Sequence, residues 1–230
     1  MNTILITGSN RGIGLELVKL YSSNNWRVLA CCRAPEQAKE LQALASSNQN
    51  INIHALDISN SQQIAHLANE LADIPVDILF NNAGIYGPYN ATFGNTDTEK
   101  WLECFNINCI APMKVTEAFI ENVAQSELKI IASMSSKMGS MADNGSGGSY
   151  LYRSSKAALN AVMKSAAIDL KHRQIKVAIL HPGWVKTDMG GTNAEITTRE
   201  CVLQLENTLK HLTLQNSGSF FEIDGTIIPW

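Results

Sequence analysis

The fold class is decided by the stretch TILITGSNRGIG at residues 3–14, in which an apolar strand runs into a glycine-rich turn and a helix opens at Leu15. Glycines let the backbone adopt positive φ angles and approach a phosphate closely, while a helix N-terminus presents free N–H groups. The order strand, glycine turn, helix therefore predicts a dinucleotide-binding α/β fold. The residues expected to hold the cofactor at this turn are Gly8, Asn10, Arg11, Gly12, Ile13 and Gly14.

Short aliphatic and β-branched segments alternate with amphipathic helical ones along the rest of the chain, which is typical of a parallel sheet with helices on both faces. The seven predicted strands are 3–7, 27–31, 51–55, 76–80, 128–133, 175–180 and 219–223. The predicted helices are 12–24, 35–46, 60–72, 99–124, 152–172 and 197–212. The first four strands are nearly continuous apolar runs, as expected of strands covered on both faces. No linker divides the pattern, so we expect a single-domain Rossmann fold over residues 1–230 that carries both cofactor binding and catalysis.

Composition narrows the function classes. A net charge of −3 gives no electrostatic footprint for nucleic acid or an anionic membrane. The five cysteines lack C-x-x-C spacing and a matching histidine pattern, which indicates reduced thiols and no metal site. No apolar run approaches the ~18 residues of a membrane helix, and the first residues do not resemble a signal peptide. We therefore expect a soluble cytoplasmic protein.

Cofactor choice depends on the end of the second strand, where an acid suits the ribose hydroxyl of NAD and a basic residue suits the 2′-phosphate of NADP. That strand ends in Ala30-Cys31-Cys32-Arg33, with no acid before Glu36. Arg33 and Arg11 together can clamp a phosphate with their guanidinium groups, although each is also compatible with a solvated surface charge. The pattern favours NADP(H).

Polar and small residues follow the third and fourth strands. Asp57 can accept from the adenine amino group beside the Ile58 backbone, or it can cap the next helix, a role that Ser59 or Asn60 also suits. The stretch Asn81–Gly84 leaves room for the adenine ribose, and an asparagine amide there can tie neighbouring strands together. The cofactor contacts expected from these two places are Asp57, Ile58, Asn82, Ala83 and Gly84.

The strongest chemical signal is Tyr152 followed by Lys156, because a four-residue spacing puts both side chains on one face of a helix. Tyrosine, with a pKa of ~10, is ordinarily a poor acid–base group. An adjacent ammonium, together with an oxidised nicotinamide, is expected to move the pKa of Tyr152 towards neutrality. The pair predicts proton transfer by Tyr152.

Two further polar positions belong with this pair. Ser136 follows the fifth strand and can hold a substrate oxygen opposite Tyr152, whereas we interpret Ser133 and Ser135 as structural. Asn108 is a weak helix former inside the predicted helix 99–124. It is expected to bend that helix and to hold a water molecule.

Taken together, these residues resemble the short-chain dehydrogenase/reductase family over the whole chain. The matching motifs, in the family's order and spacing, are Thr7–Gly14, Asn81–Gly84, Asn108, Ser136 and the pair Tyr152/Lys156. The resemblance implies an NADP(H)-dependent oxidoreductase that reduces a carbonyl group of a small molecule, with Tyr152 as general acid. It also implies that Ser136 binds the carbonyl oxygen and that Tyr152 and Lys156 contact the cofactor, with Lys156 on the nicotinamide ribose. Asn108 is implied to anchor a water in the proton relay.

The family resemblance also implies nicotinamide contacts from the loop after the sixth strand, at Pro182, Gly183, Val185 and Thr187. Within the family, the chain resembles the C-factor/Sniffer-like branch of carbonyl reductases on residues 150–160, 181–191 and 224–230. Two features depart from common members of the family. Ala111 stands where many have glycine, and the short segment 187–200 leaves little material for a lid.

Two other function classes stay open. One is a non-catalytic NADP(H)-binding sensor or signalling protein on the same scaffold, which the intact Asn108, Ser136, Tyr152 and Lys156 argue against. The other is an epimerase or dehydratase, whose members carry a larger C-terminal substrate domain than this chain does. Relatives form dimers or tetramers through helices equivalent to 99–124 and 152–172, so a homodimer or homotetramer is possible beside a monomer. The residues that suit either an apolar substrate pocket or ordinary packing are Tyr86, Met138, Met141, Trp184 and Met189.

Overall fold

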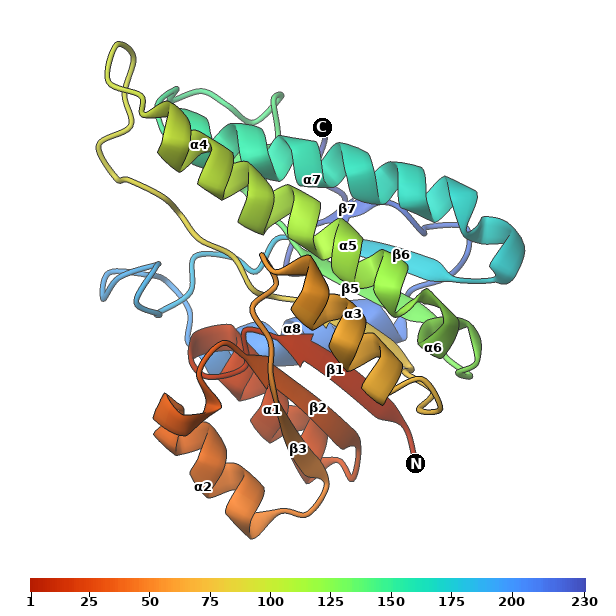
Figure 1. Cartoon of the computed structure of the whole chain (residues 1–230). Helices are drawn as coiled ribbons and strands as arrows, with labels where there is room; N and C mark the ends of the chain where they lie inside the picture. The colour runs from red at the N-terminus through yellow and green to blue at the C-terminus, as the bar shows by residue number, and fades with distance from the viewer.

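A computed structural model describes residues 1–230 as seven parallel strands in one sheet with helices on both faces (Figure 1). The strand order is β3-β2-β1-β4-β5-β6-β7, and every neighbouring pair is parallel. The strands are β1 (Thr3–Thr7), β2 (Arg27–Cys32), β3 (Ile51–Ala55), β4 (Ile78–Asn81), β5 (Ile130–Met134), β6 (Lys176–Leu180) and β7 (Phe220–Phe221). The predicted fold class, a Rossmann fold with a seven-stranded parallel sheet, is confirmed.

Helices connect the strands and cover both faces of the sheet. The helices are α1 (Gly12–Ser23), α2 (Lys39–Ser47), α3 (Ser61–Glu70), α4 (Thr98–Phe105), α5 (Ala111–Ala118), α6 (Ile120–Ala124), α7 (Tyr150–Asp169) and α8 (Thr198–Lys210). Short 3₁₀ turns lie at Pro35–Gln37 (η1), Lys137–Gly139 (η3) and Lys171–Arg173 (η4). No helix combines the length and the apolar character needed to cross a bilayer.

Two apolar cores lie on the two faces of the sheet, because alternate strand residues point to opposite sides. Ile4 and Ile6 of β1 pack with α1, α2 and α8, whereas Leu5 packs with α3, α5 and α7. All three side chains are fully buried. The resulting three layers hold the strand ends, and the loops that follow them, in fixed positions.

The strand β3 departs from the expectation of burial on both faces. Its position at the edge of the sheet leaves Asn52 and Ala55 exposed and His54 only partly buried. An edge strand is covered by neighbours on one side only, so apolar composition alone did not reveal its place.

The predicted long helix 99–124 is divided by a five-residue π-helical turn, η2, at Asn106–Ile110. Asn108 lies inside this turn with a fully buried side chain. A π turn inserts one extra residue into an α-helix, so that its hydrogen bonds join residues five apart. Such turns are frequent at functional sites. The structure therefore places a π-helical turn at Asn108, where the sequence predicted a bend.

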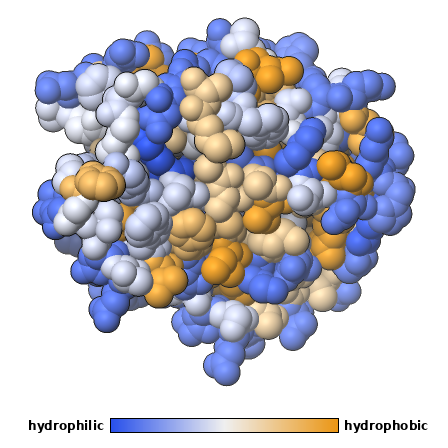
Figure 2. Space-filling model, turned by 90° about the horizontal axis from the view of Figure 1, so that it is seen from above, coloured by the Kyte–Doolittle hydropathy of each residue, from blue (hydrophilic) through white to orange (hydrophobic).

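Apolar residues gather near the centre of the face seen in Figure 2, with hydrophilic residues around them. On the helices of the upper layer in Figure 1, large exposed apolar side chains include Leu102 of α4, Ile110 of η2 and Ile168 of α7. These belong to the helical segments through which the family resemblance implies self-association.

Candidate active site

The site is built at the carboxyl ends of the strands, where β1 and β4 are joined by Asn82. The Asn82 side-chain amide donates to the carbonyl oxygens of Thr7 at 2.9 Å and Gly8 at 3.1 Å. The Asn82 backbone N–H donates to the Thr7 hydroxyl at 3.0 Å. The expected tie between neighbouring strands is therefore observed, and it fixes the glycine-rich turn against β4.

The glycine-rich turn leaves the start of α1 open. Gly8 and Gly12 have φ angles of +68° and +55°, which L side chains rarely adopt. Arg11 occupies the N-cap position of α1 without a side-chain hydrogen bond to the helix, and the first turn contains no acidic residue. The helix N–H groups and the positive end of the dipole are thus free for an anion.

The two arginines predicted to act together are in different surroundings. Arg11 forms an ion pair with Asp188 at 2.8 Å, although both side chains are largely exposed. Arg33 is exposed and forms no ion pair in the structure. The sequence did not predict a carboxylate partner for Arg11.

Asp57 does not cap α3. Its carboxylate accepts from the backbone N–H and the hydroxyl of Ser59 at 2.9 and 2.7 Å, whereas Asn60 caps the helix. Partial burial raises the pKa of Asp57, but the Ser59 hydrogen bonds and the charge of Arg33 bring it below its usual range. Asp57 is therefore a carboxylate turned into its own loop beside the buried Ile58.

Three predicted side chains gather at the end of β5 and the start of α7. Tyr152, Lys156 and Ser136 are 8%, 4% and 8% exposed. The Lys156 ammonium lies 5.7 Å from the centre of the Tyr152 ring and donates to the Met134 carbonyl oxygen at 2.8 Å. The Ser136 hydroxyl accepts from the Met138 backbone N–H at 3.2 Å. The structure thus brings the expected acid, cation and hydroxyl together.

The pKa values of this cluster correct one expectation. Burial raises the pKa of Tyr152 to about 12, an effect that hydrogen bonding with Ser136 only partly offsets. Burial also lowers the pKa of Lys156 to about 8. The expected fall in the tyrosine pKa is wrong for the protein alone, because loss of solvent disfavours the phenolate more than its neighbours stabilise it.

Of the two neighbouring serines, which we interpret from sequence as structural, Ser133 lies within β5 and Ser135 directly follows it. The Ser135 hydroxyl donates to the Asn160 side chain of α7. The Ser133 hydroxyl is buried and has no hydrogen-bond partner. Neither serine is placed as Ser136 is, at the exit of the strand beside Tyr152.

Asn108 joins the helical layer to the loop after β4. Its carboxamide accepts from the Ile85 backbone N–H at 2.9 Å and donates to the Ile85 carbonyl oxygen at 2.8 Å. It also donates to the Ser155 hydroxyl at 3.0 Å. A side chain at Gly84 would lie 3.1 Å from the Asn108 oxygen. Asn108 therefore holds the backbone next to Gly84 in place.

The loop after β6 closes against the glycine-rich turn. Gly183 has a φ of +78°, and Val185 is buried and forms an isolated bridge with Ile196. A side chain on Gly12 would lie 3.3 Å from the Thr187 methyl group. The loop with the expected nicotinamide contacts thus lies directly beside the glycine-rich turn. Pro182, at the start of this loop, is partly buried.

Aromatic stacking beside Tyr152 was not predicted. The Tyr86 ring stacks on Tyr152 with centroids 4.6 Å apart, and Tyr89 stacks on Tyr86 at 4.8 Å. Of the other apolar candidates for a substrate pocket, Met141 and Trp184 are 75% and 50% exposed. In the sequence, the sign that could have pointed to this contact is the position of Tyr86, two residues after the motif Asn81–Gly84.

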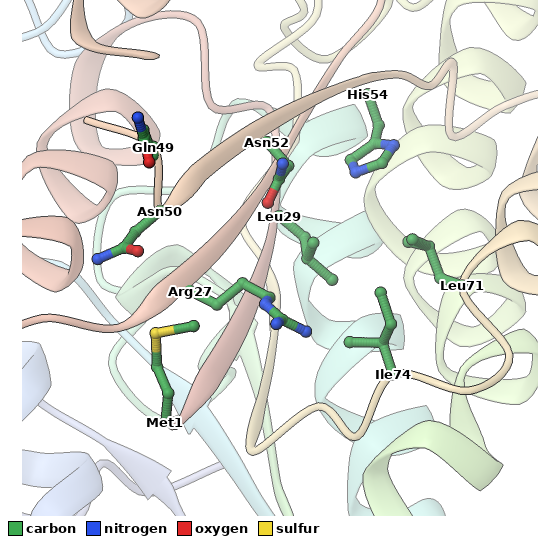
Figure 3. A pocket seen from close by; sticks show the side chains of 9 residues that line it. All are labelled: Met1, Arg27, Leu29, Gln49, Asn50, Asn52, His54, Leu71 and Ile74. Atoms are coloured by element: carbon green, nitrogen blue, oxygen red, sulfur yellow. The ribbon is translucent and has the colours of Figure 1, made fainter. Parts of the chain in front are cut away.

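A separate cavity of about 500 Å³ lies at the opposite end of the sheet, where β2 and β3 begin (Figure 3). Its lining residues are Met1, Arg27, Leu29, Gln49, Asn50, Asn52, His54, Leu71 and Ile74. None of them was a predicted site residue. Ligands of open α/β sheets bind at the carboxyl ends of the strands, so this cavity is distinct from the candidate active site.

The short chain dehydrogenase family model matches residues 2–197. The chain belongs to this family. The carbonyl reductase Sniffer of D. melanogaster is 37% identical, with a TM-score of 0.93 and 100% of both chains covered. An NADPH-bound carbonyl reductase from chicken fatty liver is 33% identical, with a TM-score of 0.93, over 100% of this chain and 99% of that one. The C-signal protein of Myxococcus xanthus is 41% identical over 156 residues, which are 68% of this chain and 93% of that protein.

These similarities confirm the family resemblance, including the carbonyl reductase branch, and with it the fold class. The predicted enzyme class, an oxidoreductase of the short-chain dehydrogenase type, is confirmed as well.

Proposed function

We propose that this short-chain dehydrogenase uses NADP(H) to reduce a carbonyl group of a small molecule, with Tyr152 as the general acid. The observation that carries the proposal is the buried cluster of Tyr152, Lys156 and Ser136 at the carboxyl end of β5. A phenol, an ammonium and a hydroxyl that are close together and shielded from solvent can deliver a proton to a carbonyl oxygen and stabilise the charge that develops.

The residues present fit a dinucleotide with a 2′-phosphate. The open N-terminus of α1 and the positive φ angles of Gly8 and Gly12 suit a pyrophosphate. The end of β2 supplies Arg33 rather than an acid, and Arg11 lies in the adjacent turn. The carbonyl reductase from chicken fatty liver has NADPH bound, which supports NADP(H) as the cofactor of this chain. We propose further cofactor contacts at Asn10, Ile13, Gly14, Asp57, Ile58, Asn82, Ala83, Gly84, Pro182, Gly183, Val185 and Thr187.

When NADPH is bound at this site, its nicotinamide would supply a hydride to the carbonyl carbon. A pKa of about 12 keeps Tyr152 protonated at neutral pH, so the phenol holds the proton that the carbonyl oxygen takes up. Ser136 donates a hydrogen bond to the same oxygen. The Lys156 ammonium, with a pKa of about 8, is mostly charged at neutral pH and stabilises the phenolate that forms. Asn108 keeps the wall of the site fixed through Ile85.

A turnover assay tests this proposal. Purified protein is incubated with NADPH or NADH and a panel of quinones, diketones, aldehydes and ketones, and cofactor oxidation is followed by absorbance. We expect turnover with NADPH that exceeds turnover with NADH, and a loss of about 100-fold or more in Ser136→Ala. Ser165→Ala is the matched control, because this exposed α7 hydroxyl contacts only the Ala161 carbonyl oxygen. Binding of NADPH without oxidation on the whole panel would argue against catalysis.

A non-catalytic, NADP(H)-binding signalling protein is the second candidate. The observation that favours it is the 41% identity to a protein named C-signal. In that case NADPH binds, no carbonyl is consumed, and replacement of Tyr152 leaves the cellular output unchanged. Turnover that depends on Ser136 rejects this candidate as the sole function.

A second copy of the chain is the proposed macromolecular partner. Leu102, Ile110 and Ile168 are 66%, 49% and 65% exposed on α4, η2 and α7, and burial of such surface stabilises association. We expect sedimentation to detect a dimer or a larger homo-oligomer that Ile168→Glu dissociates. A wild-type monomer at high concentration rejects self-association.

A further inference from the structure

Three tyrosine rings form a continuous stack from the candidate acid to the surface. Tyr86 lies between Tyr152, at 4.6 Å and 29° between ring planes, and Tyr89, at 4.8 Å and 21°. Tyr152 is buried, Tyr86 is partly buried and Tyr89 is 72% exposed. One face of the Tyr152 ring is therefore covered by another flat ring rather than by water.

Tyr86 is held firmly by its own hydroxyl. This group lies 2.9 Å from the Ser149 hydroxyl, directly before α7. Ser149 has a φ of +47°, in the left-handed region that non-glycine residues seldom occupy. The hydrogen bond ties the stacked ring to the start of the helix that carries Tyr152.

The backbone on both sides of Tyr86 is fixed as well. Ile85 is bound through both its N–H and its carbonyl oxygen by Asn108. On the other side, Gly87 packs so closely on Cys104 of α4 that an added side chain would lie 2.7 Å from the sulfur. Tyr86 is thus a rigid wall of the site and not a mobile flap.

We propose that Tyr86 is a positioning residue for Tyr152, which fixes the plane of its ring by stacking and keeps water from that face of the phenol. The proposal rests on the function proposed above for Tyr152. Aromatic pairs favour a narrow range of geometries, so the stack restricts the direction of the Tyr152 hydroxyl. Exclusion of water also keeps the phenol protonated, because the charged phenolate is poorly solvated there.

The orientation of the Tyr152 side chain matters because a proton donor acts only within hydrogen-bond reach of its acceptor. Ser136 lies close enough to the phenol for its hydroxyl to lower the pKa of Tyr152. Lys156 lies over the ring at 5.7 Å from its centre. With Tyr86 on a face of the same ring, the phenol is confined by three groups, and removal of Tyr86 releases one of them.

The test compares Tyr86→Ala, Tyr86→Leu and Tyr86→Phe, with Tyr150→Phe as the control at another tyrosine near the start of α7. We expect kcat to fall about tenfold in Tyr86→Ala, with a smaller change in KM. Tyr86→Phe keeps the stacked ring and is expected to retain at least about a third of wild-type kcat. Tyr86→Leu keeps an apolar side chain without the flat ring and is expected to fall between the two.

A second readout needs no turnover. The resonance of the isotope-labelled ζ-carbon of Tyr152, assigned by its loss in Tyr152→Phe, is followed as the pH is raised above the ordinary tyrosine pKa of about 10. Water entering in Tyr86→Ala lowers the pKa of Tyr152 from about 12, so ionisation begins at lower pH than in wild type.

The proposal is overturned if Tyr152 ionises at the same pH in the folded Tyr86→Ala variant as in wild type. A Tyr86→Phe protein as slow as Tyr86→Ala overturns it as well, because the ring would then contribute nothing. If Tyr86→Ala fails to fold, Tyr86→Leu takes its place. A Tyr86→Leu variant with the same kcat and the same Tyr152 titration as wild type would contradict the proposal. Failure of the proposed function has a different result: no carbonyl is consumed by wild type, whereas the titration still reports on the stack.

Discussion

The guanidinium of Arg11 lies 2.8 Å from the carboxylate of Asp188, so the turn after β1 is linked to the loop after β6. Arg11 is also the residue proposed, with Arg33, to bind a 2′-phosphate. One guanidinium cannot satisfy a carboxylate and a phosphate equally, and a phosphate brings more charge. We therefore expect Asp188 to compete with the 2′-phosphate for Arg11.

Replacement of Asp188 tests this competition. Asp188→Asn is expected to tighten NADPH binding about two- to fivefold, because the ion pair is exposed and weak. NADH has no 2′-phosphate, so its affinity should not change. Fluorescence titration with both cofactors measures the effect. Equal changes for NADPH and NADH would show that Asp188 acts on another part of the dinucleotide.

The Arg11 side chain is tested in the same way. Arg11→Gln is expected to weaken NADPH binding about tenfold while leaving NADH affinity nearly unchanged. Added salt should reduce the difference between wild type and the variant, because the contact is exposed. Loss of NADH affinity to the same extent contradicts a contact with the 2′-phosphate.

Asn108 is predicted to contribute to stability as well as to activity. Asn108→Ala leaves the N–H and carbonyl groups of Ile85 without partners, which is expected to lower the free energy of unfolding by about 2–3 kcal/mol. Urea denaturation measures the loss, and Asn69→Ala on the surface of α3 is a control for asparagine removal. Unchanged stability together with lost activity indicates a role in the proton relay alone.

Much of the site follows from local sequence, and the parts that do not are long-range contacts. The glycine turn, Asn82, and the pair of Tyr152 and Lys156 were predicted because strand–turn–helix order and helical spacing place them. The contact of Arg11 with Asp188 joins residues 177 positions apart, and no local pattern encodes it. The stack of Tyr86 on Tyr152 likewise depends on how the loop after β4 packs on α4.

The limits of the fold prediction have the same cause. Strand bounds were close for β1 to β6, whereas β7 is restricted to Phe220–Phe221. Phe221 also pairs with Ile227, so the chain turns back after β7 instead of extending it. Exposure of β3 depends on its place at the sheet edge, which apolar composition does not specify.

The buried Lys156 is predicted to make stability depend on pH. Its pKa is lowered from 10.5 unfolded to about 8 folded, so between these values the unfolded chain binds the proton and the folded protein does not. Raising the pH through this window therefore stabilises wild type relative to Lys156→Met, by at most about 3 kcal/mol. Below it, the variant should be the more stable protein.

Chemical denaturation of wild type and Lys156→Met at a series of pH values checks this. The difference in their free energies of unfolding should shrink as the pH rises through the window. If the two free energies of unfolding change with pH in parallel, Lys156 has the same pKa in the folded and unfolded states and the prediction is wrong.

The central claim is that Tyr152 delivers the proton, and two tyrosines two positions apart on α7 provide the most direct measurement. Wild type, Tyr152→Phe and Tyr150→Phe are compared for NADPH affinity and for NADPH oxidation with one accepted carbonyl substrate. Both variants should bind NADPH as wild type does. Tyr152→Phe should lose about 100- to 10,000-fold in kcat, and Tyr150→Phe should lose little. A Tyr152→Phe enzyme with kcat near that of wild type contradicts the account.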